Sequence, residues 1–342
     1  RMYLEYVQSG NNATACANPG TALIDYVELE IGGQRIDKHY GHWMEVWSQL
    51  TEVNPTGSNP LCAAVAINSS AATSWTTFQK MSGSGGVIGA GDTMERIFVP
   101  LQFWFCRNPG LALPLIALQY HEVKTTIALN TAAASGGNAT FGSSLKLFVD
   151  YIYLDTDERR RFAQQSHEYL IEQVQQQSLS TGVGDKELNF NHPVKELIWT
   201  SGGAAAGTVA STELVAGGTA TDATSLTDTY QLKLNGHDRF PARPHTYFSR
   251  VQIYQHHTGP GGLESDGGAA GVGVGDCNDS ICVYSFALKP EEHQPSGTCN
   301  FSRIDNAQLN CSGTVPGNSF IFAINYNVLR IMSGMGGLAY SN

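Results

Sequence analysis

The sequence predicts an all-β fold of two consecutive antiparallel jelly-roll sandwiches with few short helices. Short apolar segments of strand length recur along all 342 residues, and long stretches rich in Gly, Ala, Ser and Thr separate them. The two halves of the chain also resemble each other. A single core stops growing at about 250–300 residues, so a chain of this length is expected to hold two domains.

Strand-like segments account for most of the first half. They lie at 1–8, 22–33, 96–105, 113–123, 124–130 and 145–154. Residues 39–50 predict a short helix, because Tyr40, Trp43, Met44 and Trp47 follow i, i+3, i+4, i+7 spacing.

The polar stretch at 155–165 has helical character and suggests a boundary, so we expect domains at 1–160 and 161–342. Strand-like segments then resume. They lie at 167–177, 194–200, 229–236, 281–288 and 320–332. Each half contains a strand, a Gly turn, an Arg and an aromatic amphipathic segment, at 29–51 and at 232–258. This likeness indicates one architecture used twice.

Residues 101–123 form the most apolar stretch of the chain. The turn-forming residues between Arg107 and Gly110 interrupt it, and so does Pro114, so it is too broken to span a membrane. We expect a strand, a turn and a second strand here, with Gly110 at positive φ. An apolar surface left at the edge of a domain predicts assembly with other chains.

Charge argues against nucleic acid as a direct partner. The formal net charge is -10, from 20 basic and 30 acidic residues. The only basic run is Arg159-Arg160-Arg161, and acidic residues precede it. We interpret it as the solvated face of a linker rather than a phosphate-binding patch.

Seven cysteines show neither a CxxC pair nor zinc-ligand spacing. A reducing compartment is the simplest interpretation, with Cys106 as a core residue. A disulfide among the four late cysteines is the alternative.

The chain begins at Arg1 inside a strand-like segment, without a signal peptide or transmembrane pattern, so we expect part of the first domain, including its N-terminal strand, to be missing.

No residue pattern predicts an enzyme. His39 and His42 have HxxH spacing, and His256 and His257 are adjacent, but neither pair has the Glu of a metalloprotease motif. The Gly-rich segments lack the Lys of a P-loop and the GxSxG of a hydrolase. We therefore expect no catalytic, metal-binding or cofactor-binding residues.

Six N-x-S/T sequons occur in the sequence. They start at Asn12, Asn68, Asn138, Asn278, Asn300 and Asn310. Asn12, Asn138 and Asn278 lie in expected loops and are the candidate glycosylation sites. Asn300 opens an expected strand, so its amide is expected to be partly buried.

A carbohydrate-binding or hydrolysing β-sandwich is the alternative function. It would need exposed aromatic residues beside carboxylates, and Trp43 and Trp47 are the candidates for such a platform. Their helical spacing favours packing or a subunit contact instead.

Four segments are similar to one known family. They are "IGGQRIDKHYG", "FWFCRNPGLALPLIALQYHEV", "YSFALKPEEHQPSGTCNFSRIDNAQL" and "NYNVLRIMSGMGGLAYSN". They resemble the major capsid proteins of large nucleo-cytoplasmic double-stranded DNA viruses, of the type that infects algae such as chlorella. The likeness runs from the first strand to the last residue, and the long loops depart from it most.

The resemblance implies a structural virion glycoprotein with a double jelly roll, no enzymatic activity and no cofactor. It implies that three chains form a pseudo-hexameric homotrimer, and that such capsomers tile an icosahedral outer capsid assembled in the host cytoplasm. The expected partners are other copies of the chain and minor capsid proteins. Nucleic acid is not contacted directly, and an internal membrane is contacted only indirectly.

Overall fold

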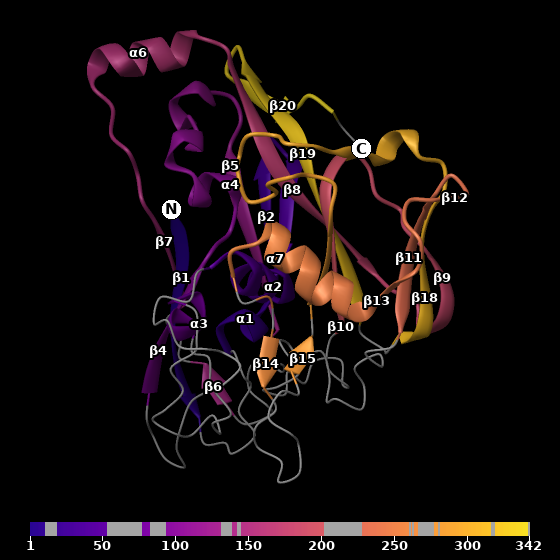
Figure 1. Cartoon of the computed structure of the whole chain (residues 1–342). Helices are drawn as coiled ribbons and strands as arrows, with labels where there is room; N and C mark the ends of the chain where they lie inside the picture. Colours follow the sequence, from indigo (N-terminus) through magenta and orange to yellow (C-terminus); the bar gives the residue numbers. More distant parts are fainter. Residues whose placement is uncertain are drawn as a thin grey trace.

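The computed structural model describes residues 1–10, 19–52, 77–82, 94–130, 139–141, 145–201, 228–259, 261, 263–265, 277–279, 281–315 and 319–340. Within these residues, antiparallel strands form two sandwiches that lie side by side (Figure 1).

The first half contributes two sheets. Their strands are β1 (Met2–Gly10), β2 (Ile24–Ile31), β3 (Gln34–Tyr40), β4 (Met94–Pro100), β5 (Val123–Leu129), β6 (Ala139–Phe141) and β7 (Lys146–Val149). In one sheet β1 pairs with β4 on one edge and with β6 and β7 on the other. In the second sheet β2 lies between β3 and β5. In β2, Val27, Leu29 and Ile31 alternate with more exposed residues and are fully buried, as expected of a strand with one face in a core.

The second half contributes two larger sheets and one small pair. Its strands are β8 (His167–Ser178), β9 (Gly182–Glu187), β10 (Pro193–Ser201), β11 (Thr229–Leu234), β12 (His237–Asp238), β13 (Arg243–Pro244), β14 (Leu263–Ser265), β15 (Cys277–Asp279), β16 (Ile281–Ser285), β17 (Cys299–Asn300), β18 (Ala307–Val315), β19 (Ser319–Met332) and β20 (Met335–Leu338). One sheet has the order β16-β10-β19 with β8 paired to β19, and the other has the order β12-β11-β18-β9.

The two halves repeat the same pairing pattern in the same chain order. β1 pairs with β4 and β7 as β10 pairs with β16 and β19. β2 pairs with β3 and β5 as β11 pairs with β12 and β18. The internal likeness seen in the sequence is therefore a likeness of fold.

Two strands of the second half have no counterpart among the described strands of the first. β8 and β9 cover the edges of β19 and β18, whereas the matching edges of β7 and β5 are uncovered in the part of the chain that the structure describes. Every residue of β7 is exposed, including Leu147, Phe148 and Val149 at 37–39 %.

Helices are short and lie around the sheets. They are α1 (Pro19–Leu23), α2 (Gly41–Thr51), α3 (Thr77–Met81), α4 (Trp104–Arg107), α6 (Thr156–Gln164), α7 (Gln252–His256), the π-helical turn η4 (Tyr247–Val251) and the 3-10 turns η2 (Pro109–Leu111), η3 (Leu115–Ala117) and η5 (Phe301–Arg303). The expected helix at 39–50 is confirmed as α2. α6 follows Asp155, whose side chain accepts from the Glu158 backbone while Glu158 reaches back to the Asp155 N–H, so a capping box fixes its start.

The expected strand, turn and strand at 101–123 is wrong. The segment folds as α4, η2 and η3 in sequence, closed by local bonds such as Ala117 N–H to the Pro114 carbonyl at 2.9 Å. Pro109 and Pro114 remove two strand donors, and the Asn108 side chain accepts from Gly110 N at 3.0 Å. Gly110 also lacks the expected positive φ, because it lies in a 3-10 turn. The segment is apolar because its aromatic residues enter the core from a non-strand backbone.

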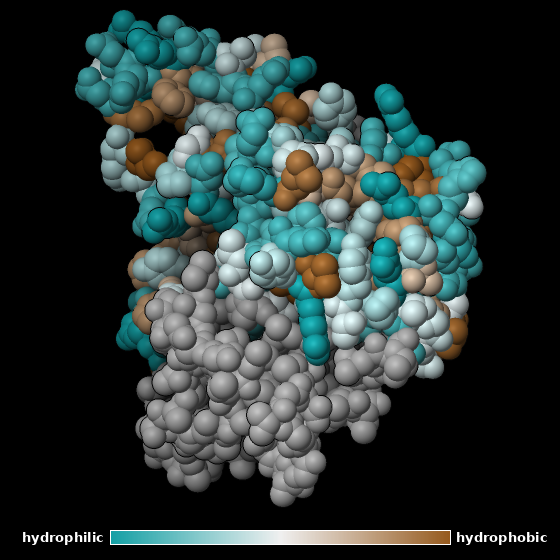
Figure 2. Space-filling model, in the orientation of Figure 1, coloured by the Kyte–Doolittle hydropathy of each residue, from teal (hydrophilic) through white to brown (hydrophobic). Residues whose placement is uncertain are grey.

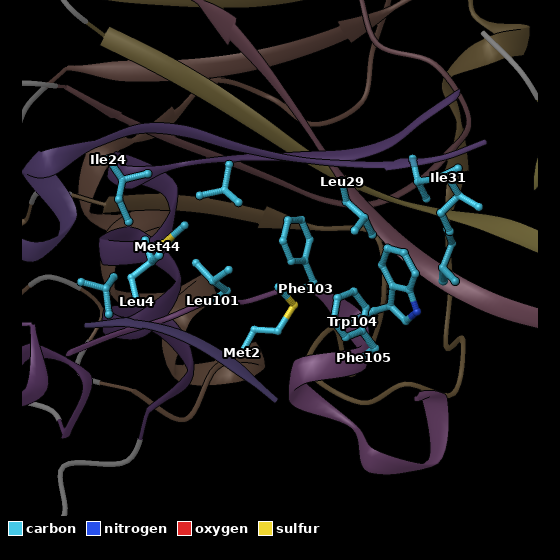
Figure 3. Packing of buried hydrophobic residues seen from close by; sticks show 14 of the residues in the cluster. Met2, Leu4, Ile24, Leu29, Ile31, Met44, Leu101, Phe103, Trp104 and Phe105 are labelled. Atoms are coloured by element: carbon cyan, nitrogen blue, oxygen red, sulfur yellow. The ribbon is translucent and has the colours of Figure 1, made fainter. Parts of the chain in front are cut away.

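The core of the first half contains these aromatic residues (Figure 3). Phe103 and Trp104 are at most 2 % exposed and pack with Leu101 and Met2. Ile171 of β8 and Leu329 of β19 belong to the same cluster, although they come from the second half. The two sandwiches therefore share part of one hydrophobic core.

The start of α2 gives a stability prediction. A Cβ at Gly41 would collide with the backbone carbonyls of Thr21 and Ile24, which cannot rotate away as a side chain can. Gly41→Ala is expected to lower the free energy of unfolding by about 1–3 kcal/mol, measured by urea denaturation. The control is Gly110→Ala, where a Cβ would meet only the Asn108 Oδ1 at 3.3 Å. Its expected change is within about 0.5 kcal/mol. Equal effects in the two variants would contradict the close approach.

Candidate functional site

The surface between the two sandwiches is the most distinctive site in the chain. α2 of the first half packs on the sheet that contains β10 and β19 of the second half. Trp43 and Trp47 are 2 % and 4 % exposed, and Trp43 contacts Phe322 with ring centroids 5.1 Å apart. The two tryptophans therefore join the halves, and their burial removes the exposed aromatic platform that sugar binding would need.

The sheet of β10 and β19 is buried on both faces as a result. In β19, Ile321 and Ala323 face the interior of the second sandwich, whereas Phe322 and Ile324 face α2. This explains why β19 begins with an unbroken apolar run, Phe320 to Ile324, rather than an alternating pattern.

A charged cluster lies beside α2 in the same junction. Glu172 of β8 accepts from the Lys195 Nζ at 2.7 Å and from the Arg107 Nη2 at 2.8 Å. Lys195 is fully buried and also donates to the Pro290 carbonyl, and the Arg107 guanidinium lies 4.8 Å from the Trp47 ring centre. Burial acts to raise the pKa of Glu172, but the two cations outweigh it and hold the pKa below its usual range. Glu172 is therefore ionised and binds residues of both halves together.

Polar contacts connect β3 directly to β8. The Asp37 Oδ1 accepts from the Val174 N–H at 3.1 Å, and Asp37 pairs with the His39 Nε2 at 2.8 Å. The Gln173 side chain donates to the Ile36 carbonyl and accepts from Asn327 Nδ2 at 3.0 Å. These bonds satisfy buried polar groups, and they fix the position of the first sandwich relative to β8.

A segment of the second half, which we call the capping segment, contains Thr258, Gly259 and Gly261 and caps the C-terminus of α2. Gly259 N–H donates to the Leu50 carbonyl at 2.8 Å, and Gly261 N–H donates to the Gln49 carbonyl at 2.8 Å. The Thr258 hydroxyl donates to the Thr51 carbonyl at 3.0 Å. The last carbonyls of α2 thus find partners in the other half of the chain.

His257 holds this capping segment in place. Its side chain is fully buried, with Nδ1 3.1 Å from the Glu291 Oε1 and Nε2 3.0 Å from the Glu196 Oε2. The contact with Glu196 is an ion pair rather than an aligned hydrogen bond. Burial alone would lower the pKa of His257, but the two carboxylates outweigh it and raise the pKa to about 9. His257 is therefore a cation at neutral pH.

A second surface, around α6, exposes large apolar side chains together with arginines. Tyr151, Ile152 and Tyr153, which precede α6, are 62–92 % exposed. α6 itself projects from the body (Figure 1), and Arg159, Arg160 and Arg161 are exposed. Figure 2 shows hydrophobic residues close to this polar helix on the visible face.

Other exposed residues extend this surface. η3 packs against α6 and carries the exposed Leu115, and Tyr120 N–H donates to the Gly334 carbonyl at 3.0 Å. Tyr120 is 76 % exposed, and Met332 and Met335 beside Gly334 are about half exposed. We use the name α6 surface for residues 151–161 together with Leu115, Tyr120, Met332 and Met335.

The candidate glycosylation sites fall mostly outside the described residues. Asn12 and Asn138 lie outside them. The expected loop at Asn278 is wrong, because this residue lies in β15 and pairs with Glu264 of β14, and its side chain is not described. Asn300 in β17 is half-buried, and its side chain accepts from the Ser302 N–H at 3.1 Å.

The histidines singled out in the sequence do not form a site together. His39 pairs with Asp37, whereas His42 stacks on Phe322 and contacts Phe320 at a tilt, and burial lowers the pKa of His42 to about 4. Within the described ranges, no cluster of three or more His, Cys, Asp or Glu could hold a metal ion. The described part of the chain also has no helix long and apolar enough to cross a membrane.

The sequence patterns did not identify Glu172, Lys195 and Glu196 as functional residues, and they gave no junction role to His257. The sequence does contain a signal for two of these residues, because Lys195 and Glu196 place adjacent charges in the otherwise largely apolar strand "VKELIWT". Adjacent charges in a core strand indicate partners from another element, but only the fold shows which ones.

Comparison with known proteins places the whole chain in one group. Residues 158–337 match the family model described as the large eukaryotic DNA virus major capsid protein, and residues 3–155 match the model of the major capsid protein N-terminus. The major capsid protein of Pyramimonas orientalis virus is 48 % identical over 94 % of this chain and 78 % of its own length. That of Paramecium bursaria Chlorella virus 1 is 39 % identical over 100 % of this chain and 84 % of its own length.

Solved structures show the same fold. A structure of the PBCV-1 virus capsid matches with a TM-score of 0.72 and 36 % identity, covering 100 % of this chain and 89 % of that one. The Faustovirus major capsid protein matches at 14 % identity and a TM-score of 0.57, covering 97 % of this chain and 78 % of that one, which supports the fold alone.

The His257 ion pairs predict a loss of stability at alkaline pH. The folded pKa of about 9 exceeds the unfolded value near 6.5, so the stabilisation is complete below pH 6.5 and is lost as the pH rises towards 9. A shift of this size corresponds to about 3 kcal/mol. Chemical denaturation at several pH values should show this decline in the wild type and a much flatter profile in His257→Gln. An unchanged profile in the variant would contradict the assignment.

Proposed function

The chain belongs to the family of large eukaryotic DNA virus major capsid proteins, and from that premise we propose that three copies associate into one pseudo-hexameric capsomer. Membership makes it a structural component of the virion capsid with a double jelly roll, and not an enzyme. The observation that carries the proposal is the repeated strand pairing of the two halves. A trimer of such chains presents six similar sandwiches around its threefold axis, and such a unit can make similar lateral contacts on six sides.

We place the boundary between the two jelly rolls within α6, with domains at 1–160 and 161–342. Two observations support this boundary. α6 is the exposed connection between β7 and β8, and the two family models meet between residues 155 and 158. By analogy with β8 and β9, a strand, turn and strand that precede β1 in chain order would cover the edges of β7 and β5. A structure of a longer chain in which both edges stay open would contradict this proposal.

The expected partners beyond the chain itself are neighbouring capsomers and minor capsid proteins. The α6 surface supports a contact with another protein, because it combines exposed tyrosines and methionines with arginines, which are enriched at protein interfaces. An internal membrane would then be reached through such proteins rather than directly, and nucleic acid is not a direct partner. Assembly in the host cytoplasm is supported by Cys106, Cys299 and Cys311, which form no disulfide within the described part of the chain.

Arg159, Arg160 and Arg161 give a test of this partner surface. Replacing all three with Gln is expected to leave folding and trimer formation intact, because α6 has no buried residue. Particles assembled from this variant should contain less of the minor proteins, measured by quantitative mass spectrometry of purified particles. Full minor-protein content would exclude the three arginines from the contact.

Trimer formation gives a direct test of the proposed capsomer. Multi-angle light scattering of the purified protein at micromolar concentration should give three times the chain mass of 36.8 kDa. A stable monomer or a dimer would contradict the proposal.

We propose Asn12, Asn138 and Asn278 as the asparagines that carry any glycan, in preference to Asn300. The support for excluding Asn300 is its half-buried side chain, which holds the first turn of η5. Glycopeptide mapping of virion protein should find sugar at one or more of these three asparagines. Sugar at Asn300 would show that this turn opens during maturation.

A further inference from the structure

Each of the two surfaces that form the junction has a counterpart in the other half of the chain. The junction forms where α2 of the first half packs on the sheet of β16, β10 and β19 in the second half. Because the strand pairing repeats, β4, β1 and β7 are the first-half counterparts of these three strands. The helical segment of η4 and α7 is the second-half counterpart of α2, since it lies between β12 and β16 in the chain as α2 lies between β3 and β4.

The side chains by which α2 contacts the second half have a regular spacing. They stand at i, i+3, i+4 and i+7 and therefore share one face of the helix. They are Trp43, Val46, Trp47 and Leu50. Met44, which follows Trp43, belongs instead to the core of its own half. One helix thus serves two purposes, with one face in its own core and another in the junction.

The segment of η4 and α7 repeats this arrangement. Phe248, like Met44, belongs to the core of its own half. The residues that stand at the matching offsets form what we call the η4–α7 face, and they are Tyr247, Arg250, Val251 and Tyr254. Val251 is 40 % exposed and Tyr254 is 88 % exposed. The face that forms the junction in α2 is therefore largely open to solvent in its counterpart.

The first half also carries an open counterpart of the sheet face that receives α2. Leu4 of β1 and Ile97 of β4 point into the core, so their neighbours Tyr3 and Phe98 point to the opposite side of the sheet. Phe148 of β7 pairs with Tyr3, and their rings stack with centroids 5.1 Å apart. The Phe98 ring lies 6.2 Å from that of Tyr3, and Phe148 is 38 % exposed. We call Tyr3, Phe98 and Phe148 the outer β1 face.

The two open faces lie on different sides of the chain. Figure 1 shows β1, β4 and β7 at its left side and α7 at its front. A contact between the faces would therefore join two chains, and it would be heterologous because the faces differ. Heterologous contacts close into a ring when the rotation between neighbours closes. In a ring of three chains, first and second halves would alternate, with a similar contact of helix on sheet at every junction.

We propose that the η4–α7 face of one chain packs on the outer β1 face of the next chain, so that the contact between chains repeats the junction within each chain. This inference rests on the proposed trimer and adds the surfaces that form it. The occupant of each face is then a second copy of the same protein.

The composition of the two helix faces fits this difference in use. α2 presents two tryptophans, which are buried as soon as one chain folds. The η4–α7 face presents two tyrosines and an arginine in the same places, so it stays soluble until another chain covers it. Tyr and Arg are also enriched at interfaces between separate proteins.

Tyr254→Glu tests the helix side of the contact. The tyrosine is 88 % exposed in the single chain, so the variant should fold normally, as checked by circular dichroism. A charge buried against three aromatic rings should raise the dissociation constant of the trimer about tenfold or more, measured by sedimentation over a concentration series. Tyr153→Glu is the matched control, because Tyr153 is 92 % exposed but lies in the α6 surface. It should leave the dissociation constant unchanged.

The outcomes separate this inference from the proposed function. A wild-type protein that never forms trimers would overturn both. A wild-type trimer that Tyr254→Glu does not weaken would overturn the inference alone, and would leave the η4–α7 face to a neighbouring capsomer or a minor protein. Equal weakening by Tyr153→Glu would show an unspecific effect of charge and would also overturn it.

Cross-linking gives a second measurement that does not depend on weakened assembly. In the double variant Tyr254→Cys with Phe148→Cys, a short bismaleimide should join the introduced thiols of neighbouring chains and give covalent dimers and trimers on denaturing electrophoresis. Each single variant measures the background from the native cysteines. Tyr254→Cys with Tyr153→Cys is the control pair and should stay at that background. A yield for the first pair no higher than for the control pair would contradict the proposed contact.

Discussion

The sheet of β16, β10, β19 and β8 is buried on both faces, and the rest of the molecule depends on that burial. One face closes the second sandwich, and the other receives α2 and part of the first core. Apolar burial is non-directional and scales with the area removed from water. Its strength here comes from large side chains such as Trp43, Trp47 and Phe322, which are nearly inaccessible. For a capsid protein, this means that each chain enters assembly as one rigid pair of sandwiches rather than as two flexibly linked domains.

The buried charges at the junction follow from the same geometry. A buried ion pair contributes little net stability over an apolar pair of similar shape, but removing one partner is strongly destabilising. Glu172 with Lys195 and Arg107, and His257 with Glu196 and Glu291, form only when α4, β8, β10 and the capping segment take their native positions. We interpret these groups as fixing one relative orientation of the halves, whereas the apolar contacts supply the free energy.

The sequence predicted the fold class, the internal repeat, helix α2 and most of the long strands, because each depends on local periodicity. It failed at 101–123, where aromatic residues such as Phe103 and Trp104 suit a strand equally well, and only the two prolines and the Asn108 cap decide for tight turns. It could not identify the charged clusters, since Glu172 and Lys195 are 23 residues apart and meet only through the pairing of the sheet. The α6 surface lay partly within reach, because its arginines and the preceding tyrosines are visible in the sequence, but the approach of Met332 and Met335 depends on tertiary contacts.

The claim that the two jelly rolls form one cooperative body is tested most directly by differential scanning calorimetry of the intact chain. A junction made of shared core residues couples the unfolding of both halves. We predict one transition, with equal calorimetric and van't Hoff enthalpies, which separates into two when Trp47 is replaced by Ala. Two well-resolved transitions in the wild-type protein would contradict this account.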